Sequence, residues 1–200
     1  QDIELSIAYS KALHKIDIIS SEEQKKIEDS LILINKEIES GKFDWRDDLE
    51  DIHMNIESRL HDLIGPIAGK IHTGKSRNDQ VATSLRMYLK SRVDHIKGLI
   101  RNLEIEIVRK ADLNFGVIMP SYTHLQRAQP VLLSHYLMAY FEMLERDISR
   151  FSECKTRMDE LILGSGAVAG SFYNIDRNFL AKELCFSRIN KNSIDGVSDR

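Results

Sequence analysis

The sequence has 200 residues, of which 42% are hydrophobic and 30% are charged, a mixture typical of a folded globular chain rather than a disordered one. Its 28 basic and 31 acidic side chains give a formal net charge of −3, which argues against general affinity for nucleic acid because that affinity needs a basic surface. No apolar run approaches the roughly 20 residues of a membrane span, so we expect no membrane partner. Only Cys154 and Cys185 are present, without metal-type spacing, and a reduced cytoplasmic location is therefore expected.

Three amphipathic helices are predicted in the first third of the chain. The first covers residues 2–16. Ser20 or Ser21 opens the second, because Ser21 is followed three residues later by Gln24 in a capping-box pattern, and Gly41 ends it. Asp47 or Asp48 can cap the third. The apolar stripes expected to be buried are Ile3, Ile7, Leu13 and Ile16, then Ile27, Leu31, Ile34 and Ile38, then Ile52, Ile56, Leu60 and Leu63.

A second face of the third helix is polar. Its members recur at steps of three, four and four residues and are Glu50, His53, Glu57 and His61. Carboxylates and imidazoles at this spacing could bind a metal ion, but no cysteine supports that reading and the established ligand patterns differ, so we predict no metal site. A solvated face and a polar wall of a functional site remain equally open.

A glycine- and proline-containing break follows, from Gly65 to Gly74. We place a domain boundary there, with an N-terminal helical domain over residues 1–74 and part of a central long-helix bundle over residues 75–200. Residues 76–113 contain no proline and predict a helix of about 38 residues, roughly 57 Å long. Its apolar residues follow near-heptad steps, which favours a multi-helix bundle or an oligomer whose helices cross subunits; they are Leu85, Leu89, Val93, Ile96, Ile100, Leu103 and Ile107.

A polar cluster, HTGKSRNDQ over residues 72–80, lies at the start of this long helix. Ser76 offers a hydroxyl, and Arg77 and Asn78 offer planar side-chain donors. A helix start also presents unpaired N–H groups and positive potential, which suit a carboxylate or phosphate. The plainer alternative is that Ser76, Asp79 and Gln80 only cap the helix, and the cluster alone leaves the two readings equal.

A second polar cluster occupies residues 119–130, MPSYTHLQRAQP. Because proline cannot continue a helix and disfavours helical backbone before it, Pro120 and Pro130 predict a non-helical insert. His124 can give or take a proton near neutral pH, while Thr123 and Gln126 can hold a polar substrate group. A lone histidine is more often structural than catalytic, but together with the anion-binding cluster upstream it indicates an enzyme.

The remaining third of the chain is predicted to be mainly helical. Residues 131–161 give a second long helix with near-heptad apolar steps. LGSGAVAGS, residues 163–171, loosely matches a dinucleotide-binding pattern, but a helix rather than a strand is expected before it, so small residues that let the backbone pass close to another segment are favoured. Asp176 caps a short helix, and residues 192–200 form a loop or another helix start. No strand pair is expected.

Several segments resemble the argininosuccinate lyase family, a branch of the fumarase and aspartase superfamily. The resemblance covers essentially the whole chain, in family order, through QDIELSIAYSKAL, EDIHMNIESRL, HTGKSRNDQVAT, MPSYTHLQRAQPV, LGSGAVAG and NSIDGVSDR. The two polar clusters carry most of the specificity, because relatives that act on fumarate, aspartate or adenylosuccinate have different versions of both.

The resemblance implies an all-α, long-helix bundle of the fumarase/aspartase type that assembles as a homotetramer with active sites shared between subunits. It implies cleavage of argininosuccinate to arginine and fumarate by β-elimination without a cofactor. It assigns substrate contacts to Asn78 and Thr123 and the acid–base role to His124. The residues expected beside them are Ser76, Arg77 and Gln126, with Asp51 and His53 near the pocket.

The sequence departs from the family pattern at two positions, Lys75 in place of Arg and Ser121 in place of Gly. The family's catalytic serine loop is expected beyond Arg200, so residues 1–200 are expected to be an inactive fragment. Two alternatives remain open: a non-catalytic, crystallin-like structural protein of the same fold, and a related lyase with another amine leaving group.

Overall fold

Helices form most of the molecule. The computed structural model describes all residues, 1–200, with 65% of them helical and 8% in strands, which confirms the expected all-α class. The chain divides into two compact units, one made of residues 1–88 and 159–200 and the other of residues 89–158. This grouping differs from the expected boundary between residues 74 and 75, which stays a prediction about domains.

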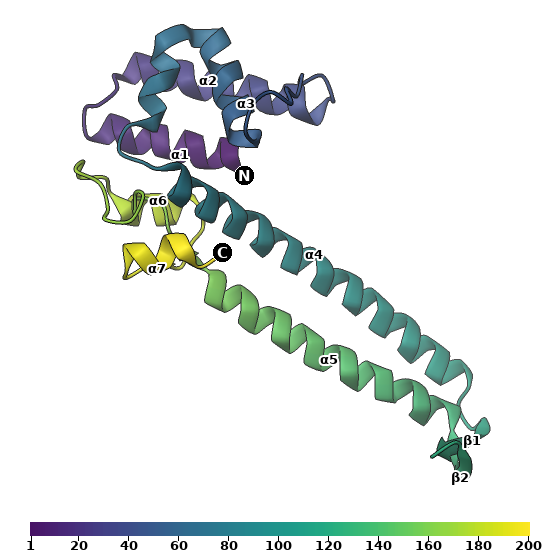
Figure 1. Cartoon of the computed structure of the whole chain (residues 1–200). Helices are drawn as coiled ribbons and strands as arrows, with labels where there is room; N and C mark the ends of the chain where they lie inside the picture. Colours follow the sequence, from purple (N-terminus) through teal and green to yellow (C-terminus); the bar gives the residue numbers. More distant parts are fainter. The chain divides into compact units, whose positions relative to one another are not determined.

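The first unit contains the N-terminal helices and the C-terminal segment (Figure 1). Its elements in chain order are α1 (Asp2–Lys15), α2 (Ser21–Glu39), α3 (Ile52–Ile64), the 3₁₀ helix η1 (Gly65–His72), the start of α4 (Arg77–Leu113), β3 (Glu160–Leu161), α6 (Arg177–Glu183), β4 (Arg188–Ile189) and α7 (Ser193–Ser198). β3 and β4 form a short parallel pair in which Leu161 lies opposite Ile189.

Ser20, one of the two residues that the sequence offered, is the N-cap of α2, but the predicted capping-box pair and the predicted cap of α3 are both wrong. The capping box of α2 joins Ser20 and Glu23, not Ser21 and Gln24, because the Ser20 hydroxyl accepts the Glu23 N–H at 3.2 Å. The N-cap of α3 is Asp51 rather than Asp47 or Asp48. Both errors have one cause: several adjacent residues can cap, and tertiary packing selects among them.

The core of the first unit joins α1, α2 and α3 to the segment around β3 and α6. Its fully buried side chains include Leu5, Tyr9, Leu13, Ile27, Leu31, Ile34, Leu60, Leu161, Leu163 and Leu180. The predicted stripes are largely confirmed, although Ile52 at the start of α3 is exposed. Burial of these apolar stripes, rather than helix propensity alone, stabilises α1, α2 and α3.

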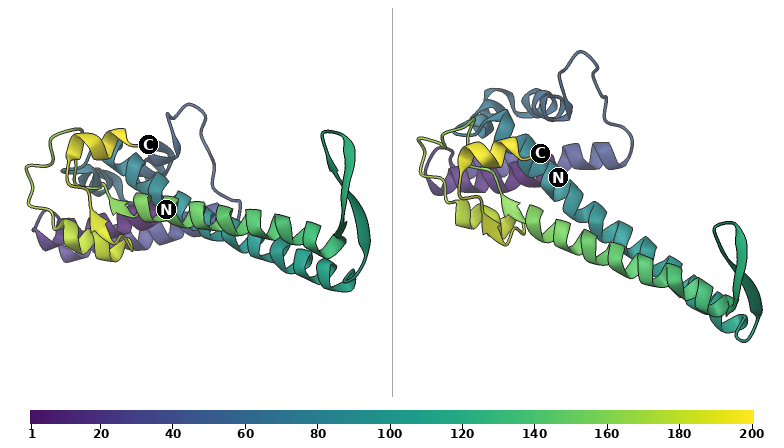
Figure 2. Two further views of the ribbon diagram at one scale, coloured as in Figure 1. Left: turned by 90° about the horizontal axis from the view of Figure 1, so that it is seen from below. Right: turned by 60° about the horizontal axis from the view of Figure 1, so that its bottom comes forward.

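The second unit is an antiparallel helix pair closed by a hairpin. Figures 1 and 2 show the later part of α4 running beside α5 (Leu133–Met158), with the hairpin strands β1 (Ile118–Thr123) and β2 (Gln126–Leu132) at the end where the helices connect. Ion pairs of Arg101 with Glu145 and of Lys155 with Asp94 join the two helices. The predicted helix over residues 131–161 is shorter at both ends, because residues 131 and 132 belong to β2 and residues 160 and 161 to β3.

The strand pair corrects the expectation that the chain has none. Residues 118–132 are non-helical, as the two prolines predict, but they form an antiparallel ribbon in which Pro120 lies opposite Pro130. Proline is tolerated here because a two-stranded ribbon consists only of edge strands, whose outward backbone needs no ladder donor.

The apolar seam predicted on α4 is only partly covered in the single chain, with three of its seven residues exposed and three half-buried. Val93 is 6% exposed, but Leu103 is 51% exposed, and Leu89 and Ile96 are also exposed. A row of large apolar residues along one helix face is typical of a surface that another helix covers. None of the helices has the length and apolar character needed to cross a membrane.

Candidate active site

The first polar cluster begins with the cap of α4. The Ser76 hydroxyl accepts the backbone N–H of Asn78 at 3.2 Å, and the Asp79 carboxylate accepts the N–H of Ser76 at 2.9 Å. Ser76 and Asp79 therefore do cap the helix, whereas the side chain of Gln80 bonds Arg77 and Asp2 instead. Asn78 itself is exposed, and its amide oxygen accepts a bond from Arg200 at 3.3 Å.

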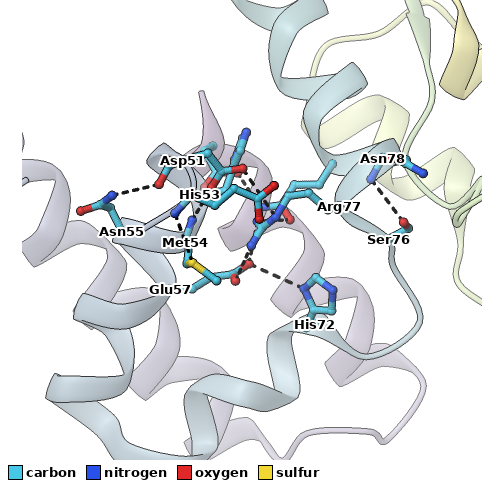
Figure 3. A network of polar contacts seen from close by, with 12 residues as sticks. Asp51, His53, Met54, Asn55, Glu57, His72, Ser76, Arg77 and Asn78 are labelled. Carbon is cyan, nitrogen blue, oxygen red and sulfur yellow. Dashed lines mark hydrogen bonds and ion pairs between the residues drawn. The ribbon is translucent and has the colours of Figure 1, made fainter. Parts of the chain in front are cut away.

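Arg77 is held by carboxylates rather than standing free. Its guanidinium makes a two-point contact with Glu57, with Nη1 to Oε1 at 3.1 Å and Nη2 to Oε2 at 2.7 Å, and Nη1 also donates to Gln80 at 2.9 Å. Asp51 lies 3.8 Å from Nε. Figure 3 shows Arg77 reaching toward Glu57 and Asp51, with Ser76 and Asn78 to one side of this contact. A planar guanidinium bound at two points has a fixed orientation, so the polar cluster has one rigid member.

Glu57, the partner of Arg77, has a strongly lowered pKa. Partial burial favours its neutral form, but hydrogen bonds with His72 and Arg77 outweigh burial and lower its pKa from 4.5 to about 2. His72 Nδ1 lies 3.6 Å from a Glu57 oxygen. Burial likewise opposes the charge of Arg77, but contact with Glu57 raises the pKa of its guanidinium. The pair therefore stays ionised through the physiological range.

The polar face of α3 consequently has two parts. Glu57 and His53 contact other helices, whereas Glu50 and His61 are exposed. The structure contains no group of three or more His, Cys, Asp or Glu side chains placed to hold a metal ion. The sequence left open whether this face is solvated or forms the wall of a site. The structure shows both: Glu57 lines the polar cluster, and Glu50 and His61 are solvated.

A buried polar network lies behind the cluster. His53 Nδ1 is 2.8 Å from Asp2 on α1, and Gln80 Nε2 donates to the same Asp2 oxygen at 2.8 Å. Burial opposes ionisation of Asp2, but the bond to His53 lowers its pKa below the ordinary value. Lys75 is buried nearby, which lowers the pKa of its ammonium, and its Nζ lies 5.4 Å from the Tyr9 ring centre.

Sequence reasoning missed the α1 members of this network. Asp2 and Tyr9 lie more than sixty residues from the motif, and the helical period of α1 marks only its apolar residues. Tyr9 donates its hydroxyl proton to the carbonyl of Thr73, the second residue of the cluster, at 2.9 Å. An aspartate at a helix start resembles an ordinary capping-region residue, so no sequence pattern marks the role of Asp2.

The second polar cluster occupies the hairpin turn. Thr123 and Gln126 lie opposite each other at the ends of β1 and β2, and His124 and Leu125 form the two-residue loop. Both loop residues have positive φ, +49° and +61°, the backbone of a turn that usually needs Gly, Asn or Asp. Thr123, His124 and Gln126 are all exposed, and Leu125 is 100% exposed. Ser76, Arg77 and Asn78 belong to the first unit and these residues to the second.

The glycine-rich segment contacts the first cluster. The N–H groups of Gly164 and Gly166 donate to Asp79 at 3.0 and 2.8 Å. The expectation that small residues bring the backbone close to another segment is confirmed. Contrary to expectation, the short strand β3 does precede this segment, but no helix begins before residue 177, so the βαβ context of a dinucleotide site is absent.

A helical scaffold with polar clusters at a helix start and in a hairpin suits an enzyme, and comparison with known sequences identifies the family. The sequence matches the family described as Lyase over residues 1–200, and the chain belongs to that family. It is 49% identical over 200 residues to the argininosuccinate lyase of Acinetobacter baumannii, covering 100% of this chain and 42% of that protein. It is 48% identical to the argininosuccinate lyase of Hydrogenovibrio crunogenus, with 100% and 43% covered.

A solved structure shares the fold at full coverage of the chain. The structure of an EDDS lyase variant with bound fumarate superposes with a TM-score of 0.86 at 29% identity, covering 100% of this chain and 39% of that one. The resemblance to the argininosuccinate lyase family is thus confirmed, and this chain spans less than half the length of the relatives named here.

Proposed function

We propose that the protein is an argininosuccinate lyase, which cleaves argininosuccinate to arginine and fumarate in cytoplasmic arginine biosynthesis. The observation that carries the proposal is 49% identity to a protein of that name over all 200 residues, including both polar clusters. The reaction proposed is a β-elimination that needs no cofactor.

The chemistry assigns a part to each cluster. Removing a proton beside a carboxylate builds negative charge on that carboxylate, and oriented donors stabilise it. In this proposal Asn78 and Thr123 contact the substrate, with Ser76 and Gln126 beside them. Arg77 supplies a fixed positive charge, since its orientation is set by Glu57 at 2.7 Å.

His124 is the proposed acid–base group. The departing guanidino nitrogen needs a proton, which a positioned imidazole can supply or relay. The left-handed backbone at His124 and Leu125 supports a functional role, because strain of this kind gathers at sites where geometry matters. Full exposure of the turn fits a site that other protein surfaces complete.

The assembly we propose is a homotetramer with active sites shared between subunits. The exposed seam on α4, which includes Leu89, Ile96 and Leu103, supports helix packing between subunits. A second copy of this helix pair would cover apolar residues that the single chain leaves in water.

The test is fumarate release, followed by ultraviolet absorbance, from the complete gene product. Argininosuccinate, adenylosuccinate and aspartate are supplied separately, and we expect turnover with the first. Absence of fumarate above background with every substrate would favour the crystallin-like structural alternative. Faster turnover of adenylosuccinate or aspartate would replace the proposed substrate with that of a related lyase.

A further inference from the structure

Asp79 joins two segments that are far apart in the sequence. One carboxylate oxygen accepts the N–H of Ser76 at 2.9 Å, and the other accepts the N–H groups of Gly164 at 3.0 Å and Gly166 at 2.8 Å. The side chain is 0% exposed. A single buried carboxylate therefore holds the start of α4 against the 164–166 turn.

The backbone at Thr73 and Gly74, just before α4, is also held by other parts of the first unit. Tyr9 bonds the Thr73 carbonyl, and Gly74, at φ +76°, has no room for a side chain, because a Cβ there would lie 2.8 Å from the Ser171 hydroxyl and 2.9 Å from the Tyr173 ring. Residues 73 and 74 are thus fixed by packing. Residues 76–78 follow after Lys75, and the bond from the Ser76 N–H to Asp79 fixes their start.

A capping role alone does not account for Asp79. A capping box needs one acceptor at the third helical position, and the longer Glu or Gln is the usual residue there. Asp79 makes that bond with one oxygen and directs the other to two amides on a different segment. Hydrogen bonds to a charged acceptor are about twice as strong as neutral ones, and here all three donors are backbone groups that cannot turn away.

We propose that Asp79 is a positioning residue that sets Ser76, Arg77 and Asn78 by fixing the start of α4 to the 164–166 turn. Its oxygens are engaged by backbone N–H groups, so it acts through these neighbours and not on the substrate. The effect on substrate binding rests on the proposed function. The contact between Asp79 and the 164–166 turn does not depend on the proposed function, and it is measured separately from substrate binding.

Two substitutions distinguish a positioning role of Asp79 from a capping role alone. Asp79→Asn keeps the size but leaves one oxygen for three donors, so at least one N–H loses its acceptor. Asp79→Glu keeps the charge and the preferred capping chemistry, but its extra methylene displaces the carboxylate from the glycine amides. If Asp79 only caps α4, Asp79→Glu behaves like the wild type.

Thr83→Val is the matched control. Thr83 is buried on the same helix, one turn further, and its hydroxyl donates to the backbone carbonyl of Asp79 at 2.7 Å, so the variant also loses a buried hydrogen bond but keeps the Asp79 carboxylate. The Thr83 hydroxyl bonds within α4 and not to the 164–166 turn. A general loosening of α4 therefore affects the Asp79 variants and Thr83→Val alike, whereas loss of the contact with the 164–166 turn affects only the Asp79 variants.

The measurements are amide hydrogen exchange and steady-state kinetics on the complete gene product. In Asp79→Glu we expect exchange at Gly164 and Gly166 to accelerate about tenfold or more, and in Asp79→Asn we expect the same at one or more of the Ser76, Gly164 and Gly166 N–H groups, as loss of bonds to a charged acceptor predicts. The KM for argininosuccinate should rise about tenfold with a smaller change in kcat, because a misplaced binding segment weakens substrate and transition state alike. Thr83→Val should leave both readouts near wild type.

The outcomes are distinguishable. Unchanged exchange at Gly164 and Gly166 in Asp79→Glu, or at all three of Ser76, Gly164 and Gly166 in Asp79→Asn, overturns the positioning role, whatever the activity. Wild-type behaviour of Asp79→Glu, or a KM change equal to that of Thr83→Val, reduces Asp79 to a capping or packing residue and also overturns it. A wild type that releases no fumarate overturns the proposed function, while glycine exchange still decides whether Asp79 holds the two segments together.

Discussion

Arg77 illustrates how the structure changes the meaning of a residue identified from sequence. The motif suggested a donor free to bind a substrate carboxylate, whereas the guanidinium is bound at two points by Glu57 and contacts Gln80. Spacing along α3 placed Glu57 on the correct face, but the sequence left open whether that face was solvated or lined a site. Its partner lies twenty residues away, beyond what helical periodicity can predict.

The Glu57 pair makes stability depend on pH in the acid range. The folded-state pKa of about 2 lies below the ordinary 4.5, so ionised Glu57 stabilises the fold above about pH 4.5, and this contribution is lost as the pH falls toward 2. The contribution is on the order of 3 kcal/mol, of which about 2 kcal/mol disappears between pH 6 and pH 3. We expect Glu57→Gln to reduce this part of the pH dependence in urea unfolding.

The control for that measurement is Glu50→Gln, an exposed glutamate two residues before α3. It should follow the wild-type pH dependence. Equal pH dependence of the free energy of unfolding in wild type and Glu57→Gln would show that the Arg77 contact does not set the ionisation of Glu57.

His124 supports a second prediction at this scale. We expect His124→Asn to lower kcat for fumarate release by about 10² or more, the usual cost of losing one acid–base group, with helical content by circular dichroism unchanged. The exposed His135 near the start of α5 provides the control, and His135→Asn should retain activity. Near-normal turnover of His124→Asn would remove this residue from the proposed mechanism.

Among the elements, the hairpin was the least predictable. Two prolines correctly excluded a helix, but they also argued against strands, and residues 118–132 lack the alternation of a half-buried strand because most of them are exposed. The turn has neither Gly nor Asn to mark it. By contrast, the long helices were predictable, because apolar spacing and the absence of proline act over many turns.

The start of α2 gives a direct test of cap selection. Ser20→Ala removes the hydroxyl that accepts the Glu23 N–H, and we expect it to lower the free energy of unfolding by about 1 kcal/mol. Ser21 is the first residue of the helix, so Ser21→Ala should change stability by only a few tenths of a kcal/mol. Chemical denaturation of the two variants compares them, and a larger loss in Ser21→Ala would contradict the observed cap.

For the whole molecule, local patterns predicted the class of fold but not the contacts that organise the cluster around Arg77. Apolar periodicity located α1, α2, α4 and α5 within a few residues. The bonds that fix residues 73–80 come instead from Asp2, Tyr9 and the 164–166 turn, across sequence separations that only tertiary structure brings together. The buried network therefore became visible only in three dimensions.

The exposed seam on α4 leads to a prediction about assembly. Leu103→Asp places a charge on an apolar face that we propose is covered by another subunit, and burying an unpaired charge is costly. We expect analytical ultracentrifugation of the complete gene product to show smaller species. Asn102→Asp adds the same charge one residue away at an exposed polar position and should leave the assembly intact. Unchanged sedimentation of Leu103→Asp would place the subunit contact elsewhere.

The two left-handed residues at the hairpin tip also bear on protein engineering. Glycine adopts such backbone angles without steric penalty, so Leu125→Gly relaxes the loop, and a search for heat-resistant variants would tend to select it. The same relaxation would widen the range of directions open to the neighbouring imidazole. Leucine at position 125 therefore costs backbone strain but restricts the conformations of the loop that carries His124.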